Sequence, residues 1–192
     1  MLATLLFAIA VRASAQTLPD PNLLLHGELV VQRGRGSIDR QTGKGVLKVR
    51  RARLLLGAAS NGIDPGAETL FVAIGEDVFT LPAGMLGVSR NGRVFSYRAP
   101  RPREARALHA FRLRTRPDGY HDIRLVVSGV DLFRLVLADP VCVPVTVIVG
   151  DDEGFVGANV TSPSFPSRSL SVRGTCAACS PFAPAHTTEP CE

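Results

Sequence analysis

The feature that most constrains this fold is a pair of alternating runs joined by a tight turn. In Ala107–Thr115, apolar residues alternate with arginines, and His121–Ser128 alternates apolar with charged residues. A period of two is typical of a strand with one buried face and one exposed face. The link between the runs contains Asp118-Gly119, which favours a hairpin because glycine adopts positive φ without steric cost. The sequence therefore predicts an antiparallel hairpin at this point.

Similar short runs recur along the 192 residues, separated by turn residues such as those at Asn61-Gly62 and Asn91-Gly92. Helical periodicity is hard to find, and one short candidate lies near Arg103–Leu108. The glycines in Gly34-Arg35-Gly36 and Gly43-Lys44-Gly45 fit loops. We expect an all-β protein, an antiparallel β-sandwich of about ten short strands. The expected strands are Glu28–Gln32, Val46–Leu56, Thr69–Ile74, Val78–Leu81, Arg93–Arg98, Ala107–Thr115, His121–Ser128, Leu132–Leu137, Val141–Val149, Gly154–Val160 and Ser169–Arg173.

The N-terminus has the pattern of an export signal. The apolar run Leu2–Val11 is too short to span a bilayer, which needs about 20 residues. It is followed by Ala13-Ser14-Ala15, a small-x-small pattern that signal peptidases cleave, although no Lys or Arg precedes the run. The alternative is a buried N-terminal segment. We expect a signal peptide over 1–15, a β-sandwich domain over 16–173, a Cys/Pro-rich tail over 174–192, and a secreted or periplasmic location.

Two stretches of the chain resemble each other at an offset of 75 residues, which predicts an internal repeat over 28–82 and 107–160. Chance similarity between two strand–turn units is the alternative. The matching residues are Asp64-Pro65, Val72 and Gly75-Glu76-Asp77 in the first copy, and Asp139-Pro140, Val147 and Gly150-Asp151-Asp152 in the second. This combination resembles predicted secreted bacterial proteins built from short "DP…V.IG.D.F" strand units. The resemblance implies a β-sandwich with two similar halves and implies no activity, because its motifs are structural.

Four cysteines, Cys142, Cys176, Cys179 and Cys191, predict two disulfides in an exported chain. Three pairings exist, and the pairs Cys142–Cys176 and Cys179–Cys191 would hold the tail against the sheet. One alternative is a redox site at Cys176-Ala-Ala-Cys179. The other is a zinc site formed by Cys176, Cys179, His186 and Cys191.

An acidic turn offers a candidate cation site. Asp151, Asp152 and Glu153 supply the carboxylate oxygens that Ca²⁺ prefers, but their spacing is not that of an EF-hand loop. Acidic residues are also common at exposed hairpin tips. We therefore expect no metal and no cofactor.

Arginine dominates the basic residues, with 20 Arg against two Lys and a formal net charge of +5. Arg112, Arg114 and Arg116 would form a cationic stripe if they share one strand face, and guanidinium groups bind carboxylates and phosphates well. The alternative is a solvated face that reflects codon bias. Few aromatic residues lie nearby for base stacking, so we expect no specific nucleic-acid binding. The partner class that the stripe favours is an acidic surface polymer.

Sequence motifs of catalysis, such as G-x-S-x-G and H-E-x-x-H, do not occur in the chain. His121 and Asp122 are adjacent in an expected strand, so their side chains should point to opposite faces. We expect His109 to be a core residue. Our first hypothesis is an exported, non-enzymatic β-sandwich protein with a structural or binding role. The alternatives are a polyanion- or glycan-binding module, a redox or zinc protein, and a hydrolase whose Asp and His come from distant segments.

Overall fold

The computed structural model describes residues 20, 23–39, 42–64, 66–100, 106–131, 141–161 and 169–176. The all-β class is confirmed, since these residues form eleven strands and no α-helix. Within the described ranges there is accordingly no helix of the length and hydropathy that a membrane span requires. The strands are β1 (Leu25–Ile38), β2 (Lys44–Leu55), β3 (Leu70–Ile74), β4 (Asp77–Leu81), β5 (Gly87–Val88), β6 (Val94–Arg98), β7 (Ala107–Thr115), β8 (Tyr120–Asp131), β9 (Val141–Val149), β10 (Asp152–Thr161) and β11 (Ser169–Cys176).

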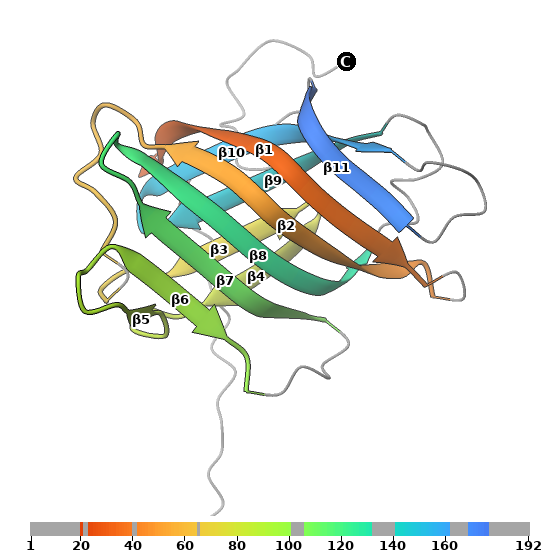
Figure 1. Ribbon diagram of the computed structural model, residues 1–192, viewed down its shortest axis with the longest axis horizontal. Coiled ribbons are helices and arrows are strands. Elements are labelled where there is room, and N and C mark those ends of the chain that lie inside the picture. The colour runs from red at the N-terminus through yellow and green to blue at the C-terminus, as the bar shows by residue number, and fades with distance from the viewer. Residues whose placement is uncertain are drawn as a thin grey trace, which may run out of the picture.

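All eleven strands belong to one continuous sheet in the order β4-β3-β9-β10-β11-β1-β2-β8-β7-β6-β5. The sheet is mixed, because the start of β1 pairs in parallel with β10 while its second half pairs antiparallel with β11. It curls so that β10, β9, β3 and β4 lie behind β1, β2, β8 and β7 (Figure 1). β4 and β7 are in contact, although they lie near opposite ends of the strand order. The expected division into two separate antiparallel sheets is thus replaced by one curled sheet.

The inward faces of the two halves pack against each other as one hydrophobic cluster. It joins Leu29 and Leu125 from the front half to Val145 and Val147 from the back half, all almost fully buried. Burying a Val or Leu side chain contributes roughly 1.5–3 kcal/mol, so this cluster is the main source of stability. The opposite face of the front strands is left outside the core.

The hairpin predicted from Asp118-Gly119 is confirmed. β7 and β8 pair antiparallel, and Gly119 between them has a φ of 82°. Two other local expectations were wrong. Gly34 and Gly36 lie within β1 rather than in a loop, and Ala107 and Leu108, the end of the expected Arg103–Leu108 helix, belong to β7. Residues 101–105 and the expected strand 132–137 lie outside the described residues.

The two segments that suggested a repeat are neighbours in the sheet. β3 pairs antiparallel with β9, and Val72 lies opposite Val147, its counterpart at the 75-residue offset. The hairpin β3–β4 turns at Gly75 and the hairpin β9–β10 turns at Gly150, both with positive φ. Gly75-Glu76-Asp77 and Gly150-Asp151-Asp152 therefore occupy equivalent turns on adjacent hairpins. Pro65, Asp139 and Pro140 of the two motifs lie outside the described residues.

Candidate polyanion-binding face

Alternation along β7 sets which side chains face solvent. Phe111 and Leu113 are buried in the core, while Arg112 and Arg114, which alternate with them, are exposed. This is the pattern of a strand whose second face is solvated. The structure thus places two of the three arginines singled out in the sequence on the outer face of the front strands.

Sheet register extends this stripe across strands into a row of arginines. Arg112 on β7 lies opposite Arg124 on β8. On β2, Val49 and Ala52 pair with Leu125 and Ile123, the two neighbours of Arg124. Arg50 and Arg51 lie between Val49 and Ala52 at a register shift, and therefore beside Arg124. Arg51 in turn lies opposite Arg33 on β1. One row of guanidinium groups therefore crosses four adjacent strands.

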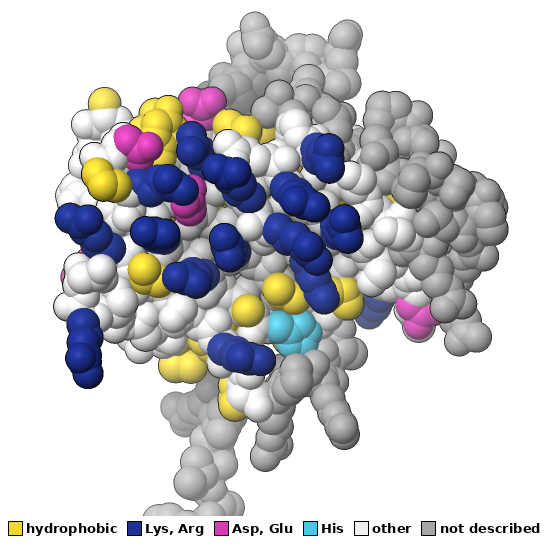
Figure 2. All heavy atoms as spheres, in the orientation of Figure 1, with side chains coloured by type: hydrophobic (Ala, Val, Ile, Leu, Met, Phe, Trp, Pro, Cys, Tyr) yellow, Lys and Arg dark blue, Asp and Glu magenta, His cyan; other side chains and the backbone are white. Residues whose placement is uncertain are grey.

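A second row runs beside the first and contains Arg98, Lys48 and Arg35. Arg98 pairs with Ala110, Ala110 with Val126, Val126 with Lys48, and Lys48 with Arg35. We call the exposed cations of this outer surface the basic face, which Figure 2 shows as a cluster of Lys and Arg side chains. Its members are Arg33, Arg35, Lys48, Arg50, Arg51, Arg98, Arg112, Arg114 and Arg124.

Most of these cations have no nearby carboxylate partner within the described part of the chain, although the charge of Arg51 acts on Asp122. Among the residues that the structure describes, none of the nine forms an ion pair with a carboxylate. Neighbouring strands are about 4.8 Å apart, so the positive charges of a row lie close together. Like charges directly opposite each other in a sheet are destabilising, and the basic face keeps several of them in register. The paired N–H donors of a guanidinium group are also well suited to bind two oxygens of a carboxylate, sulfate or phosphate.

Arg116, the third arginine singled out in the sequence, has a different role. It lies just beyond β7, and its Nε donates a hydrogen bond to Asp122 Oδ2 at 2.6 Å. Its Nη2 forms an ion pair with the same oxygen, also at 2.6 Å. The hydrogen bond and charge of Arg116, with contributions from Arg53 and Arg51, hold the pKa of Asp122 below its usual range. Arg116 is therefore engaged within the protein, at the edge of the basic face.

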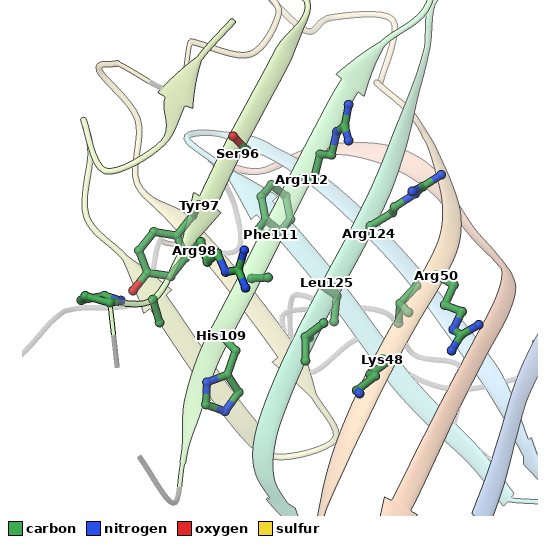
Figure 3. A pocket seen from close by; sticks show the side chains of 15 residues that line it. Lys48, Arg50, Ser96, Tyr97, Arg98, His109, Phe111, Arg112, Arg124 and Leu125 are labelled. Atoms are coloured by element: carbon green, nitrogen blue, oxygen red, sulfur yellow. The ribbon is translucent and has the colours of Figure 1, made fainter. Parts of the chain in front are cut away.

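A shallow depression lies within the basic face and is open to solvent, with a volume of about 1240 Å³ (Figure 3). Arg112 and Arg124 stand at one end of it, Arg98 and Lys48 at its sides, and His109 at the opposite end. No carboxylate is among the described residues that line it. The depression therefore combines a concave shape with one sign of charge, which concentrates anions near a surface.

His109 was expected in the core, and this was wrong. The register of β7 and β8 shifts between Leu108 and Ala110, so His109 leaves the alternation and lines the depression. Its Nε2 lies 2.7 Å from Ser128 Oγ, which fixes the ring at the end of the depression. An extra residue of this kind redirects one side chain without breaking the strand.

The buried polar residues do not form the arrangement that a hydrolase with distant Asp and His residues would need. Ser60 Oγ donates a hydrogen bond to Asp152 Oδ2 at 2.8 Å, whereas His121 Nδ1 lies 3.2 Å from Thr115 Oγ1. Burial lowers the pKa of His121, which the nearby Asp152 carboxylate opposes, and burial raises the pKa of Asp152. The serine is thus bound to a carboxylate rather than to an imidazole that could take its proton. Asp122 points to the outer face, as expected for the neighbour of the buried His121.

The candidate calcium residues are not brought together. Asp152 faces the interior beside Ser60, while Glu153, the next residue in β10, binds His26 Nδ1 at 2.6 Å. Among the described residues there is no group of three or more side chains that could hold a metal ion. In the zinc set, the side chain of Cys176 and all of Cys179, His186 and Cys191 lie outside the description.

Lys48, Arg50, Arg33 and Arg35 were not assigned to the site from the sequence. They lie in β1 and β2, far from β7 in the chain, and only the register brings them together. The available signal was the alternation of Lys48 and Arg50 with Leu47 and Val49, which predicts the same outward face.

Comparison with known proteins gives little further information. No protein-family model matches this chain, and no curated protein matches it. Among solved structures, the archaeal flagellin FlaB1 from Methanocaldococcus jannaschii is similar over 78% of this chain and 99% of the flagellin chain, with 13% sequence identity and a TM-score of 0.31. A likeness at this level supports no argument about fold or function.

Proposed function

We propose that this chain is an exported, non-enzymatic protein that binds an acidic polymer outside the cytoplasm through its basic face. The observation that carries the proposal is the set of nine exposed cations, in rows across β6, β7, β8, β2 and β1, none of which forms an ion pair with a described carboxylate. A linear polyanion would supply the missing counter-charges along a row.

The energetics favour several weak contacts over one strong contact. An exposed ion pair contributes only about 0–1 kcal/mol, so a single arginine would hold an anion poorly. A polymer that contacts several cations at once gains from the high effective concentration of each further charge. The rows on the basic face therefore suit a repeating anion better than a small ligand.

Export is the second part of the proposal and is supported by the N-terminal run and by cysteine content. The apolar run and the Ala13-Ser14-Ala15 pattern are typical of a cleaved leader. The four cysteines would form two structural disulfides in an oxidising compartment. Cys142 on β9 is the cysteine whose side chain the structure describes, and it is not a free thiol. An extracellular location would bring the basic face into contact with acidic surface polymers.

The test is retention on an immobilised sulfated polysaccharide, heparin, eluted with a salt gradient. We expect the wild-type protein to bind and to elute with salt, because screening weakens each contact. The double variant Arg112→Gln with Arg124→Gln should elute at clearly lower salt. The matched control, Lys44→Gln with Arg90→Gln, removes the same charge from exposed positions outside the rows. Equal elution of the two double variants would show that net charge, and not the basic face, causes retention.

A further inference from the structure

The depression has an apolar floor enclosed by cations. Ala110 on β7 and Val126 on β8 lie opposite each other, half-buried, and both line it. In the same row, Arg98 flanks Ala110 on the β6 side and Lys48 flanks Val126 on the β2 side. The opposed Arg112 and Arg124 close one end (Figure 3).

The dimensions of the floor follow from sheet geometry. Neighbouring strands are about 4.8 Å apart, so Arg98 and Lys48, three strand spacings apart, are separated by roughly 14 Å at the backbone. The next exposed position along a strand is about 6.8 Å away, which is the step from Ala110 to Arg112. The apolar area therefore has about the size of one sugar ring, with cations within side-chain reach on three sides.

From this arrangement we infer that the depression is a subsite for one pyranose ring of an acidic polysaccharide, a polyuronate, and this inference rests on the proposed function. The C–H face of the ring would cover Ala110 and Val126. Its carboxylate would accept hydrogen bonds from Arg112 or Arg124, because a guanidinium group presents paired N–H donors to two oxygens. Small side chains at both floor positions leave room for the ring.

The same residues disfavour a nucleobase as the occupant. Single-stranded nucleic acids bind largely through stacking on aromatic side chains. Phe111 lines the depression but is 1% exposed and belongs to the core. Tyr97 is half-buried and packs against the same core cluster. Tyr97 also lines the depression, so of the two aromatic side chains there one is buried and the other half-buried. A pyranose ring, in contrast, needs only a small apolar surface for its aliphatic C–H groups.

The test separates ring recognition from charge recognition by using two polymers with different backbones. Affinities for polygalacturonate, which has a pyranose ring at each charge, and for inorganic polyphosphate, which has none, are measured by titration at the same ionic strength. Ala110→Leu fills the floor without changing the charge. Ala59→Leu, at an exposed turn outside the depression, is the matched control. Thermal melting of both variants checks that they are folded.

We expect Ala110→Leu to weaken polygalacturonate binding at least fivefold while polyphosphate binding stays within twofold, and Ala59→Leu to change neither. If Ala110→Leu leaves both affinities unchanged, the subsite inference is wrong while the proposed function stands. If the wild-type protein binds neither polymer, the proposed function itself fails. Oligothymidylate binding that is weakened by Ala110→Leu, with polygalacturonate binding unaffected, would assign the floor to a nucleobase and overturn the inference.

Discussion

Arg112 on β7 lies directly opposite Arg124 on β8, and no described carboxylate is paired with either guanidinium group. Like charges at directly opposed positions cost the folded state stability. Arg50 and Arg51 on β2 add positive charge on the other side of Arg124. The protein therefore keeps a repulsive arrangement at two exposed, directly opposed positions. A polyanionic partner would neutralise these opposed charges and so relieve the repulsion.

Removing one of these charges should make the free protein more stable. We expect Arg124→Gln to raise the free energy of unfolding at low ionic strength by a few tenths of a kcal/mol, about the scale of one opposed pair in a sheet. The gain should vanish near 1 M salt, where the Debye length is about 3 Å. Urea unfolding at both salt concentrations measures it, with Arg90→Gln as the control at an exposed turn. A loss of stability at low salt would mean that Arg124 has a structural role.

The buried His121 should make the protein less stable in mild acid. Burial lowers the pKa of His121 in the folded state, while its unfolded value stays near 6.5. As the pH falls below about 6.5, the unfolded chain takes up a proton that the folded protein resists, so stability decreases until the lower folded pKa is reached. Asp152 has the opposite effect, because its pKa is raised in the folded state. As the pH falls toward its unfolded value of 3.8, proton uptake by the folded protein increases stability.

The difference between wild type and His121→Gln therefore isolates the histidine. We expect the wild type to lose melting temperature between pH 7 and 5 more steeply than the variant, in thermal melts recorded at several pH values. Parallel curves for the two proteins would contradict the burial of a neutral imidazole at this position.

Gly27 should be essential where β1 enters the sheet between β2 and β10. A Cβ at this position would lie 2.3 Å from the backbone oxygen of Leu55 and 3.2 Å from that of Glu153. Since backbone atoms on both sides cannot move easily, Gly27→Ala should lower the free energy of unfolding by about 1–3 kcal/mol, as overpacking does. Gly87→Ala is the control, because its nearest contact would be 3.5 Å away and its φ is not positive. Similar stability of both variants in urea would contradict the close approach at Gly27.

The cysteines should be oxidised. We expect non-reducing mass spectrometry to show a protein lighter by two hydrogens for each of two disulfides, with Cys142 joined to one of Cys176, Cys179 and Cys191 in a peptide map. The strands of the core are also connected by the sheet, so the protein should remain folded after reduction while its tail is released. Recovery of free thiols together with bound zinc would replace this account with the zinc alternative.

The sequence was a good guide wherever a run alternates regularly. The β7–β8 hairpin follows from the period of two and from Asp118-Gly119, and the exposure of Arg112 and Arg114 follows from the same period. β1 was predicted too short, because Gly34 and Gly36 suggested a loop. In the structure a Cβ on either glycine would meet the side chain of Val172 or Leu170 on β11, so the glycines allow close packing within the sheet.

The basic face could be predicted only in part, because it depends on register and on local shifts in register. Arg50 and Arg51 both face solvent at a shift in β2, and His109 leaves the core at a shift in β7. Such irregularities depend on how neighbouring strands fit together, and no single segment encodes them. The row from Arg112 to Arg33 likewise requires the strand order β7-β8-β2-β1, which local patterns do not contain.

Chemical footprinting of the arginines tests the central claim most directly. Phenylglyoxal modifies exposed guanidinium groups, and peptide mass spectrometry gives the rate at each residue with and without polygalacturonate. The account predicts that the polymer slows modification of Arg50, Arg98, Arg112 and Arg124 severalfold and leaves Arg90 unchanged. Equal rates with and without a bound polymer at these four residues, or protection confined to arginines outside the basic face, would contradict it.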